Sequence, residues 1–236
     1  MMASEEHPLY GGAGGRQDSA PGAVRLALAA AGAVVLALLF AALASAVLPV
    51  GTVPSWDKLV FLRIGAHATL AGERWFTVVS LLGSPLPWVV AGASVLILAW
   101  RRRALLALEW TAGFGGGKLL ETALKVEIHR PRPPGAGRFL HGASFGFPSG
   151  HVMGALLCYA LLAHTLTRLT PSAHRHRVLI WLGVAGIVAA VAVSRLYLGV
   201  HYLSDVVAGV LAAGAWLLLC FTAFDAARIR WPFPRS

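Results

Sequence analysis

Residues 24–48 read VRLALAAAGAVVLALLFAALASAVL, and Arg25 is the only charged residue among them. A helix of this length can cross a hydrocarbon core about 30 Å thick. A cleaved signal peptide is the alternative, because Ala44-Ser45-Ala46 has the small side chains of a cleavage site. The apolar stretch is longer than the roughly 7 to 15 residues of a signal-peptide core. We therefore expect a retained first transmembrane span.

The composition extends this interpretation to the whole chain. Hydrophobic residues make up 57% of the 236 residues, charged residues make up 13%, and the mean hydropathy is +0.70. These values are too apolar for an ordinary soluble domain. Five more apolar stretches follow the first: Phe76–Trp100, Ala104–Val126, Ser149–Leu166, Val178–Val200 and Ser204–Ala226.

The sequence therefore predicts an all-α, polytopic membrane protein with six transmembrane helices in a bundle. We expect this domain to cover residues 23–227, with a mobile tail at 1–22 and a short basic tail at 228–236. Gly83, Pro85 and Pro87 should make the start of the second span irregular. Between the first two spans, apolar residues at helical spacing predict a short interfacial helix: Trp56, Val60, Phe61 and Ile64.

The formal net charge of +10 comes from short arginine clusters between the apolar stretches. This pattern fits membrane topology better than nucleic-acid binding, for which a basic face would be expected. The clusters are 101–103, then 168, 175 and 177, and finally 228, 230 and 235. If these sides are cytoplasmic, both termini are cytoplasmic as well. Residues 50–75, 127–148 and 200–204 then lie on the outer face of the cell membrane.

Three polar segments adjoin the apolar stretches on this predicted outer side: 125–133, 148–151 and 194–205. They bring Lys125, Arg132 and Arg195 close to hydrocarbon, where an unpaired charge is costly and usually marks a ligand site. Arginine and lysine together suit a phosphate group. The sequence thus predicts one shared anion site at the outer ends of the helices.

The second segment, Pro148-Ser149-Gly150-His151, precedes the fourth span. Ser149-Gly150 opens this predicted helix, where backbone N–H groups at the helix N-terminus can bind an anion, and Gly150 permits its close approach. An ordinary junction between a turn and a helix is the alternative interpretation.

His201 and Asp205 are four residues apart, so a helix would place them on one side. The carboxylate could then hold one imidazole nitrogen and leave the other free as a nucleophile. His151, from a different helix, could protonate the leaving oxygen and then activate water. Two ordinary polar residues near a membrane surface would be the simpler explanation of the His201 and Asp205 pair.

The segments read Lys-x6-Arg-Pro, Pro-Ser-Gly-His and Ser-Arg-x5-His-x3-Asp. In this form and order they resemble the signature motifs of the type-2 phosphatidic acid phosphatase superfamily, and the resemblance covers about residues 24–226. It implies that His201 is the nucleophile, His151 the general acid and Asp205 the partner that orients His201. The phosphate-binding residues that it implies are Lys125, Arg132, Ser149, Gly150 and Arg195.

The resemblance implies an enzyme that hydrolyses a phosphomonoester or diphosphate of a membrane lipid, without a metal ion or other cofactor. Undecaprenyl diphosphate, phosphatidylglycerophosphate and phosphatidic acid are all compatible substrates, with a slight preference for the isoprenoid diphosphate. A vanadate-dependent haloperoxidase of the same superfamily is an alternative, although six spans argue against it. A lipid-phosphate binding or transport protein is another, and the intact catalytic set argues against that.

Several other sequence features carry less weight. Residues 113–118 are glycine-rich but lack the spacing of a nucleotide-binding loop, so we expect them to serve helix packing. Glu121 should pair with Lys125 one helical turn later. Glu109, inside the third span, should be buried against a partner.

Overall fold

The computed structural model describes residues 20–48, 53–136 and 145–230, and these residues form helices without any β-strand. Most of the two predicted tails, together with His141, lies outside the described residues. The helices are α1 (Ala20–Val47), α2 (Ser55–Gly65), α3 (Leu70–Ser80), α4 (Leu86–Trp100), α5 (Ala104–Trp110), the π-helical turn η1 (Thr111–Gly116), α6 (Gly117–Ile128), α7 (Gly150–Leu169), α8 (Pro171–Arg175), α9 (Arg177–Tyr197) and α10 (Leu203–Arg230).

Within the described residues, four helices are long and apolar enough to cross a membrane: Gly22–Val47, Gly150–Leu169, Arg177–Tyr197 and Leu203–Arg228. The all-α, multi-pass membrane architecture is thus supported. The other two predicted spans differ in construction. Helix α4 has 15 residues, which is about 22 Å at the usual rise. The stretch after it consists of α5, η1 and α6 in succession and runs from Ala104 to Ile128.

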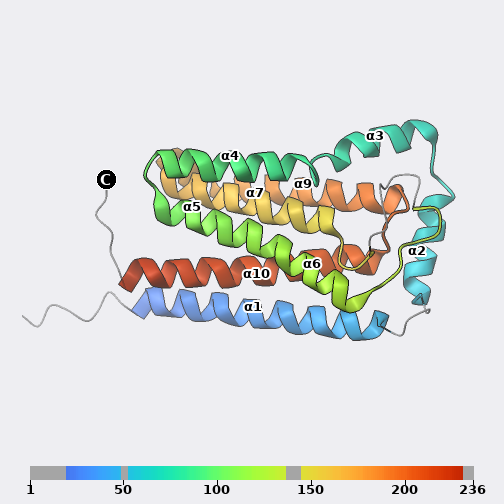
Figure 1. Cartoon of the computed structure of the whole chain (residues 1–236), viewed down its shortest axis with the longest axis horizontal. Helices are drawn as coiled ribbons and strands as arrows, with labels where there is room; N and C mark the ends of the chain where they lie inside the picture. Colours follow the sequence, from blue (N-terminus) through green and yellow to red (C-terminus); the bar gives the residue numbers. More distant parts are fainter. Residues whose placement is uncertain (1–19, 49–52, 137–144, 231–236) are drawn as a thin grey trace, which may run out of the picture.

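Helix α7 forms the centre of the bundle. It packs against α4, α6, α9 and α10, and many of its side chains are completely buried, among them Met153, Leu157 and Leu161. Helix α1 lies along α10 on one side of the molecule (Figure 1). This arrangement lets α7 hold its first turn in a fixed position relative to the ends of three neighbouring helices.

Helix α2 lies across one end of the bundle, and α3 lies beside α9 and leads to α4 (Figure 1). The predicted short helix after the first span is present as α2, and α4 begins only after the turn containing Gly83 and Pro85. This turn packs tightly on α7, since a Cβ added at Gly83 would lie 2.9 Å from the Cβ of His151.

Glu109 is buried near the other end of the bundle, as the sequence predicts. Its carboxylate forms an ion pair with Arg228 of α10 and lies 3.1 Å from Nε2 of His164. A short exposed network continues from there, because Arg168 pairs with Asp225. These contacts join α5, α7 and α10, so the polar groups here serve helix packing.

Candidate active site

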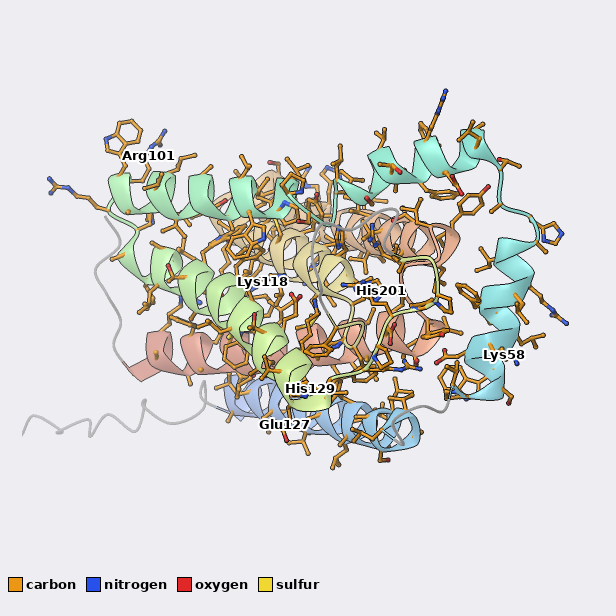
Figure 2. All side chains as sticks on the ribbon, turned by 45° about the vertical axis from the view of Figure 1, so that its right-hand side comes forward. Lys58, Arg101, Lys118, Glu127, His129 and His201 are labelled. Carbon is orange, nitrogen blue, oxygen red and sulfur yellow. The ribbon has the colours of Figure 1, made fainter. Side chains whose placement is uncertain are left out.

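The three polar segments meet at the end of the bundle where α2 lies. They come from the end of α6, the start of α7, and the turn between α9 and α10 (Figure 1). In Figure 2, His201 lies at this end, and Lys118 lies farther toward Arg101 at the opposite end. The structure therefore brings the predicted site residues to one region of the molecule.

Asp205 lies in the first turn of α10. Its Oδ2 accepts a hydrogen bond of 2.9 Å from the backbone N–H of Tyr202, as an acidic residue does in a capping box. The same oxygen lies 3.3 Å from Nδ1 of His201. The predicted contact between His201 and Asp205 is thus present. It is formed across the start of α10, since this helix begins at Leu203, and not along one helical face.

The hydrogen bonds of His201 define its tautomer. Its Nε2 lies 2.9 Å from the guanidinium of Arg132. Arginine can only donate, so Nε2 must be the acceptor of a neutral ring and Nδ1 carries the proton toward Asp205. Arg132 is held in turn by the carbonyl of Val200, at 3.0 Å. The unprotonated nitrogen of His201 therefore faces the cationic side of the site.

Burial and charge both keep this histidine neutral. Only 1% of His201 is exposed. Burial lowers its pKa well below the ordinary value of 6.5, and the cations of Arg132, Arg195 and Lys125 lower it further. A neutral imidazole with one nitrogen unprotonated is the form that can act as a nucleophile.

The start of α7 supplies the second part of the site. Ser149 is fully buried, and its backbone N–H donates to the carbonyl of Asp205 at 2.9 Å. Its hydroxyl is buried without a hydrogen-bond partner in the described part of the chain, which leaves it able to bind an anion. Gly150 opens the helix and His151 follows it, half-buried in the first turn.

Gly150 faces a charged group of α6. A Cβ added there would lie 2.0 Å from Oε1 of Glu121 and 3.0 Å from Nζ of Lys125. Lys125 and Glu121 form the predicted ion pair, at 2.7 Å, and Lys118 pairs with the same carboxylate. Glu121 therefore holds Lys125 beside the start of α7.

Arg195, near the end of α9, is 3% exposed. Its Nε is also buried without a hydrogen-bond partner among the residues that the structure describes. The preceding Ser194 donates to the carbonyl of Val191 at 2.6 Å. This bond satisfies the Ser194 hydroxyl within its own helix, which favours a structural role for that residue. The charge of Arg195 is close enough to His201 to lower the pKa of that ring.

The sequence interpretation assigns no role to three buried residues beside His201, namely Asp57, Arg130 and Ser204. Arg130 bridges Asp57 and Asp205, with N···O distances of 2.8 and 2.5 Å. Asp57 belongs to α2, whose charged residues are expected to face water in an interfacial helix. Its distance from the motifs in the sequence leaves no local signal for this contact.

Comparisons with known proteins show which chains this protein is similar to. The chain is 39% identical over 113 residues to phosphatidylglycerophosphatase B of Bacillus subtilis (strain 168), an alignment that covers 48% of this chain and 54% of that protein. This chain thus spans about half the length of that curated relative.

A solved structure is also similar: the crystal structure of a transmembrane PAP2-type phosphatidylglycerolphosphate phosphatase from Bacillus subtilis. It superposes with a TM-score of 0.71 at 29% identity, covering 83% of this chain and 96% of that one. Residues 105–229 match the family model of the PAP2 superfamily. This range is more than half of the chain and contains every motif residue from Lys125 to Asp205, so the chain belongs to the PAP2 superfamily.

Proposed function

We propose that this protein is an integral-membrane lipid phosphatase that forms a phosphohistidine intermediate on His201. The observation that carries this proposal is the hydrogen bonding of His201, whose Nε2 is unprotonated and faces Arg132 while Nδ1 faces Asp205. Cations on the phosphate side and a carboxylate behind the ring are what an attack on a phosphate ester requires.

In the first step, Nε2 of His201 attacks phosphorus and the bond from phosphorus to the lipid oxygen breaks. His151 donates a proton to the leaving oxygen. Asp205 stabilises the positive charge that develops on the His201 ring. In the second step, His151 takes a proton from water, the hydroxide attacks phosphorus, and the P–N bond breaks to release inorganic phosphate and neutral His201.

Five groups are proposed to bind the phosphate oxygens. Lys125, Arg132 and Arg195 supply charge, and the buried Ser149 and the first turn of α7 at Gly150 supply neutral donors. The partnerless Ser149 hydroxyl and Arg195 Nε support this assignment, because buried donors are normally satisfied. Positive charge fixed in place before the reaction stabilises the transition state without further reorganisation.

A phosphatidylglycerophosphate is our first choice of substrate, because the curated relative and the similar solved structure are both named for its hydrolysis. Undecaprenyl diphosphate and phosphatidic acid present the same phosphate chemistry to the site. We also propose six membrane spans, with α4 as the second and α5 to α6 as the third. The site then lies on the outer face of the cell membrane.

Phosphate release from purified lipids in detergent micelles tests the function. The panel contains phosphatidylglycerophosphate, phosphatidic acid and undecaprenyl diphosphate, each assayed with EDTA present. We expect turnover of at least one lipid by the unaltered protein, and none by His201→Ala.

His174→Ala, which changes an exposed histidine of α8, serves as the matched control and should retain full activity. Activity that is lost in EDTA and restored by magnesium would contradict the mechanism. Failure to release phosphate from any of the three lipids would contradict the function.

A further inference from the structure

Asp57 of α2 is completely buried at the start of α10. Its Oδ1 accepts a hydrogen bond of 2.9 Å from the backbone N–H of Ser204, and its Oδ2 accepts one of 2.5 Å from the Ser204 hydroxyl. The first N–H groups of a helix have no partner within the helix and carry partial positive charge. Asp57 therefore caps α10 from a separate helix.

Arg130 connects this cap to the proposed catalytic aspartate. One guanidinium nitrogen lies 2.8 Å from Oδ2 of Asp57, and the other lies 2.5 Å from both Oδ1 of Asp205 and the Ser204 hydroxyl. The planar fork of arginine suits two carboxylates held in a fixed relation. The group also lies over the ring of Tyr202, at 4.9 Å.

The two oxygens of Asp205 thus have different partners. Oδ1 binds Arg130, while Oδ2 faces the His201 ring and the Tyr202 N–H. A carboxylate fixed through one oxygen cannot rotate freely, so the other oxygen keeps its direction. That oxygen also orients the His201 ring. Arg130 therefore affects the reacting nitrogen of His201 indirectly, through its contact with Asp205.

We propose that Asp57 and Arg130 are positioning residues of the active site: they fix Asp205, and through Asp205 they fix the direction of the His201 ring. This inference rests on the proposed function of His201 as the nucleophile. It also implies that α2 contributes to the active site, although this helix lies outside residues 105–229, which match the family model.

A purely structural clamp between α2 and α10 is the competing explanation. Both explanations predict some loss of stability when a member of a buried charge network is removed. Only the positioning role predicts that a folded variant binds lipid normally but forms phosphoenzyme slowly. It also predicts that the effect depends on Asp205, because the influence of Arg130 on His201 passes through that carboxylate.

The test uses the full chain in detergent with the lipid that the unaltered protein hydrolyses best, labelled at the phosphate. Rapid-quench single turnovers give the rate constant of phosphoenzyme formation and the half-saturating lipid concentration. We expect Arg130→Lys and Asp57→Asn to slow phosphoenzyme formation by about 10- to 100-fold. Mutating residues that hydrogen-bond to metal-binding histidines lowers metal affinity or activity by a similar factor. The half-saturating concentration should change by less than about threefold.

Arg168→Gln is the matched control for loss of an ion pair, because Arg168 pairs with Asp225 at the other end of the bundle; it should not slow the step. In a protein that already carries Asp205→Asn, adding Arg130→Lys should slow phosphoenzyme formation by less than about a further twofold. Two results would overturn the positioning role. One is an unchanged rate of phosphoenzyme formation in folded Arg130→Lys and Asp57→Asn. The other is that Arg130→Lys slows this step as much in the Asp205→Asn protein as in the unaltered protein.

A second measurement does not need turnover. NMR of the histidine rings should show the Nδ1–H proton of His201 at the low field of a hydrogen bond to a carboxylate in the unaltered protein, and shifted to higher field in Arg130→Lys. The same Nδ1–H chemical shift in both proteins would overturn the proposal even if none of the lipids were hydrolysed. An inactive unaltered protein with this difference in chemical shift would instead reject the proposed function and keep the positioning role.

Discussion

His201 and His151 occupy different surroundings, and their proposed roles respond differently to the leaving group. His201 is buried between Arg132 and Asp205, whereas His151 is half-buried in the first turn of α7. An alkoxide leaving from a lipid monophosphate needs a proton more than a phosphate leaving from a lipid diphosphate does. The two histidines can therefore be separated by comparing substrates.

We expect His151→Ala to reduce kcat/KM for a lipid monophosphate by roughly 10² to 10⁴, and to reduce it less for a lipid diphosphate. His201→Ala should abolish both activities, because no phosphoenzyme can form. The measurement is kcat/KM for phosphatidic acid and undecaprenyl diphosphate, with release of the leaving group shown to be limiting. Equal losses for the two substrates would reject the acid role of His151.

The fall of kcat/KM at low pH, its acid limb, tests how the surroundings of His201 set the pKa of this ring. Its pKa is held well below 6.5 by burial and by Arg132, Arg195 and Lys125. Arg132→Gln removes one of these cations, so the pKa of His201 should rise and the ring should become protonated, and inactive, at a higher pH. The acid limb of kcat/KM should therefore move to higher pH than in the unaltered protein.

This shift is measured from about pH 4 to pH 8, because the pKa of His201 in the unaltered protein lies well below 6.5. Ionisation of the substrate phosphate affects both proteins equally, so the difference between them reports the enzyme. Arg132→Lys keeps the positive charge and should show a smaller shift than Arg132→Gln. An acid limb at the same pH in all three proteins would contradict the stated cause.

The motif residues were predictable because their chemistry is local in the sequence. Lys125 and Glu121 are one helical turn apart, and Ser149-Gly150 follows a proline at the start of a helix. The contact between Asp57 and Arg130 joins residues far apart in the chain and depends on how α2 docks. Nothing in the residues around Asp57 distinguishes it from a solvated aspartate on an amphipathic helix.

Among the helices, the turn η1 and the start of α6 show that the glycine-rich residues 113–118 serve helix packing. Gly116 and Gly117 let α6 approach Trp216 of α10, whose indole nitrogen donates to the carbonyls of Ala112 and Gly113 at 3.2 and 3.0 Å. The predicted packing role of this segment is thus confirmed. The sequence did not indicate that this segment would form a π-helical turn between α5 and α6.

Two neighbouring alanine substitutions test this packing. A Cβ at Gly116 would lie 2.5 Å from Cζ2 of Trp216, and the hydrogen bonds of the indole restrict how far the ring can move. Gly116→Ala should therefore lower the free energy of unfolding by about 1 to 3 kcal/mol. Gly115→Ala meets nothing within 4 Å and should be neutral or stabilising by up to about 1 kcal/mol.

Thermal unfolding in detergent, followed by tryptophan fluorescence and circular dichroism, measures both variants. The comparison is internal, because the two sites are adjacent and the substitution is the same. If Gly116→Ala and Gly115→Ala shift the melting temperature equally, close packing against Trp216 is not the reason for glycine at position 116.

The sequence predicts six spans, the second with an irregular start, whereas only four helices in the described part of the chain reach spanning length by themselves. Proline and glycine explain part of the difference. Pro85 and Gly83 delay the start of α4, which the sequence indicated. The turn η1 divides Ala104–Ile128 and packs against α7 and α10, and hydropathy does not record such contacts.

In the whole molecule, the arginine clusters and the proposed active site lie at opposite ends of the bundle. The arginines at 101–103 follow α4, those at 168, 175 and 177 surround α8, and Arg228 lies near the end of α10. In Figure 1 these helix ends lie together at the end away from α2, and α1 also begins there. Arginine on one side of the spans favours a cytoplasmic location for that side.

Two serine-to-cysteine substitutions test the resulting orientation. Ser55 is exposed at the start of α2, beside the site, and Ser172 is exposed in α8, at the arginine end. The native Cys158 and Cys220 are buried and should give little background. A membrane-impermeant maleimide added to intact cells should label Ser55→Cys, and should label Ser172→Cys only after the membrane is opened. Because the substitutions add no charge, they leave the arginine pattern that determines orientation unchanged. Labelling of Ser172→Cys in intact cells, with Ser55→Cys protected, would show that the site faces the cytoplasm and that its lipid substrate is drawn from the inner leaflet.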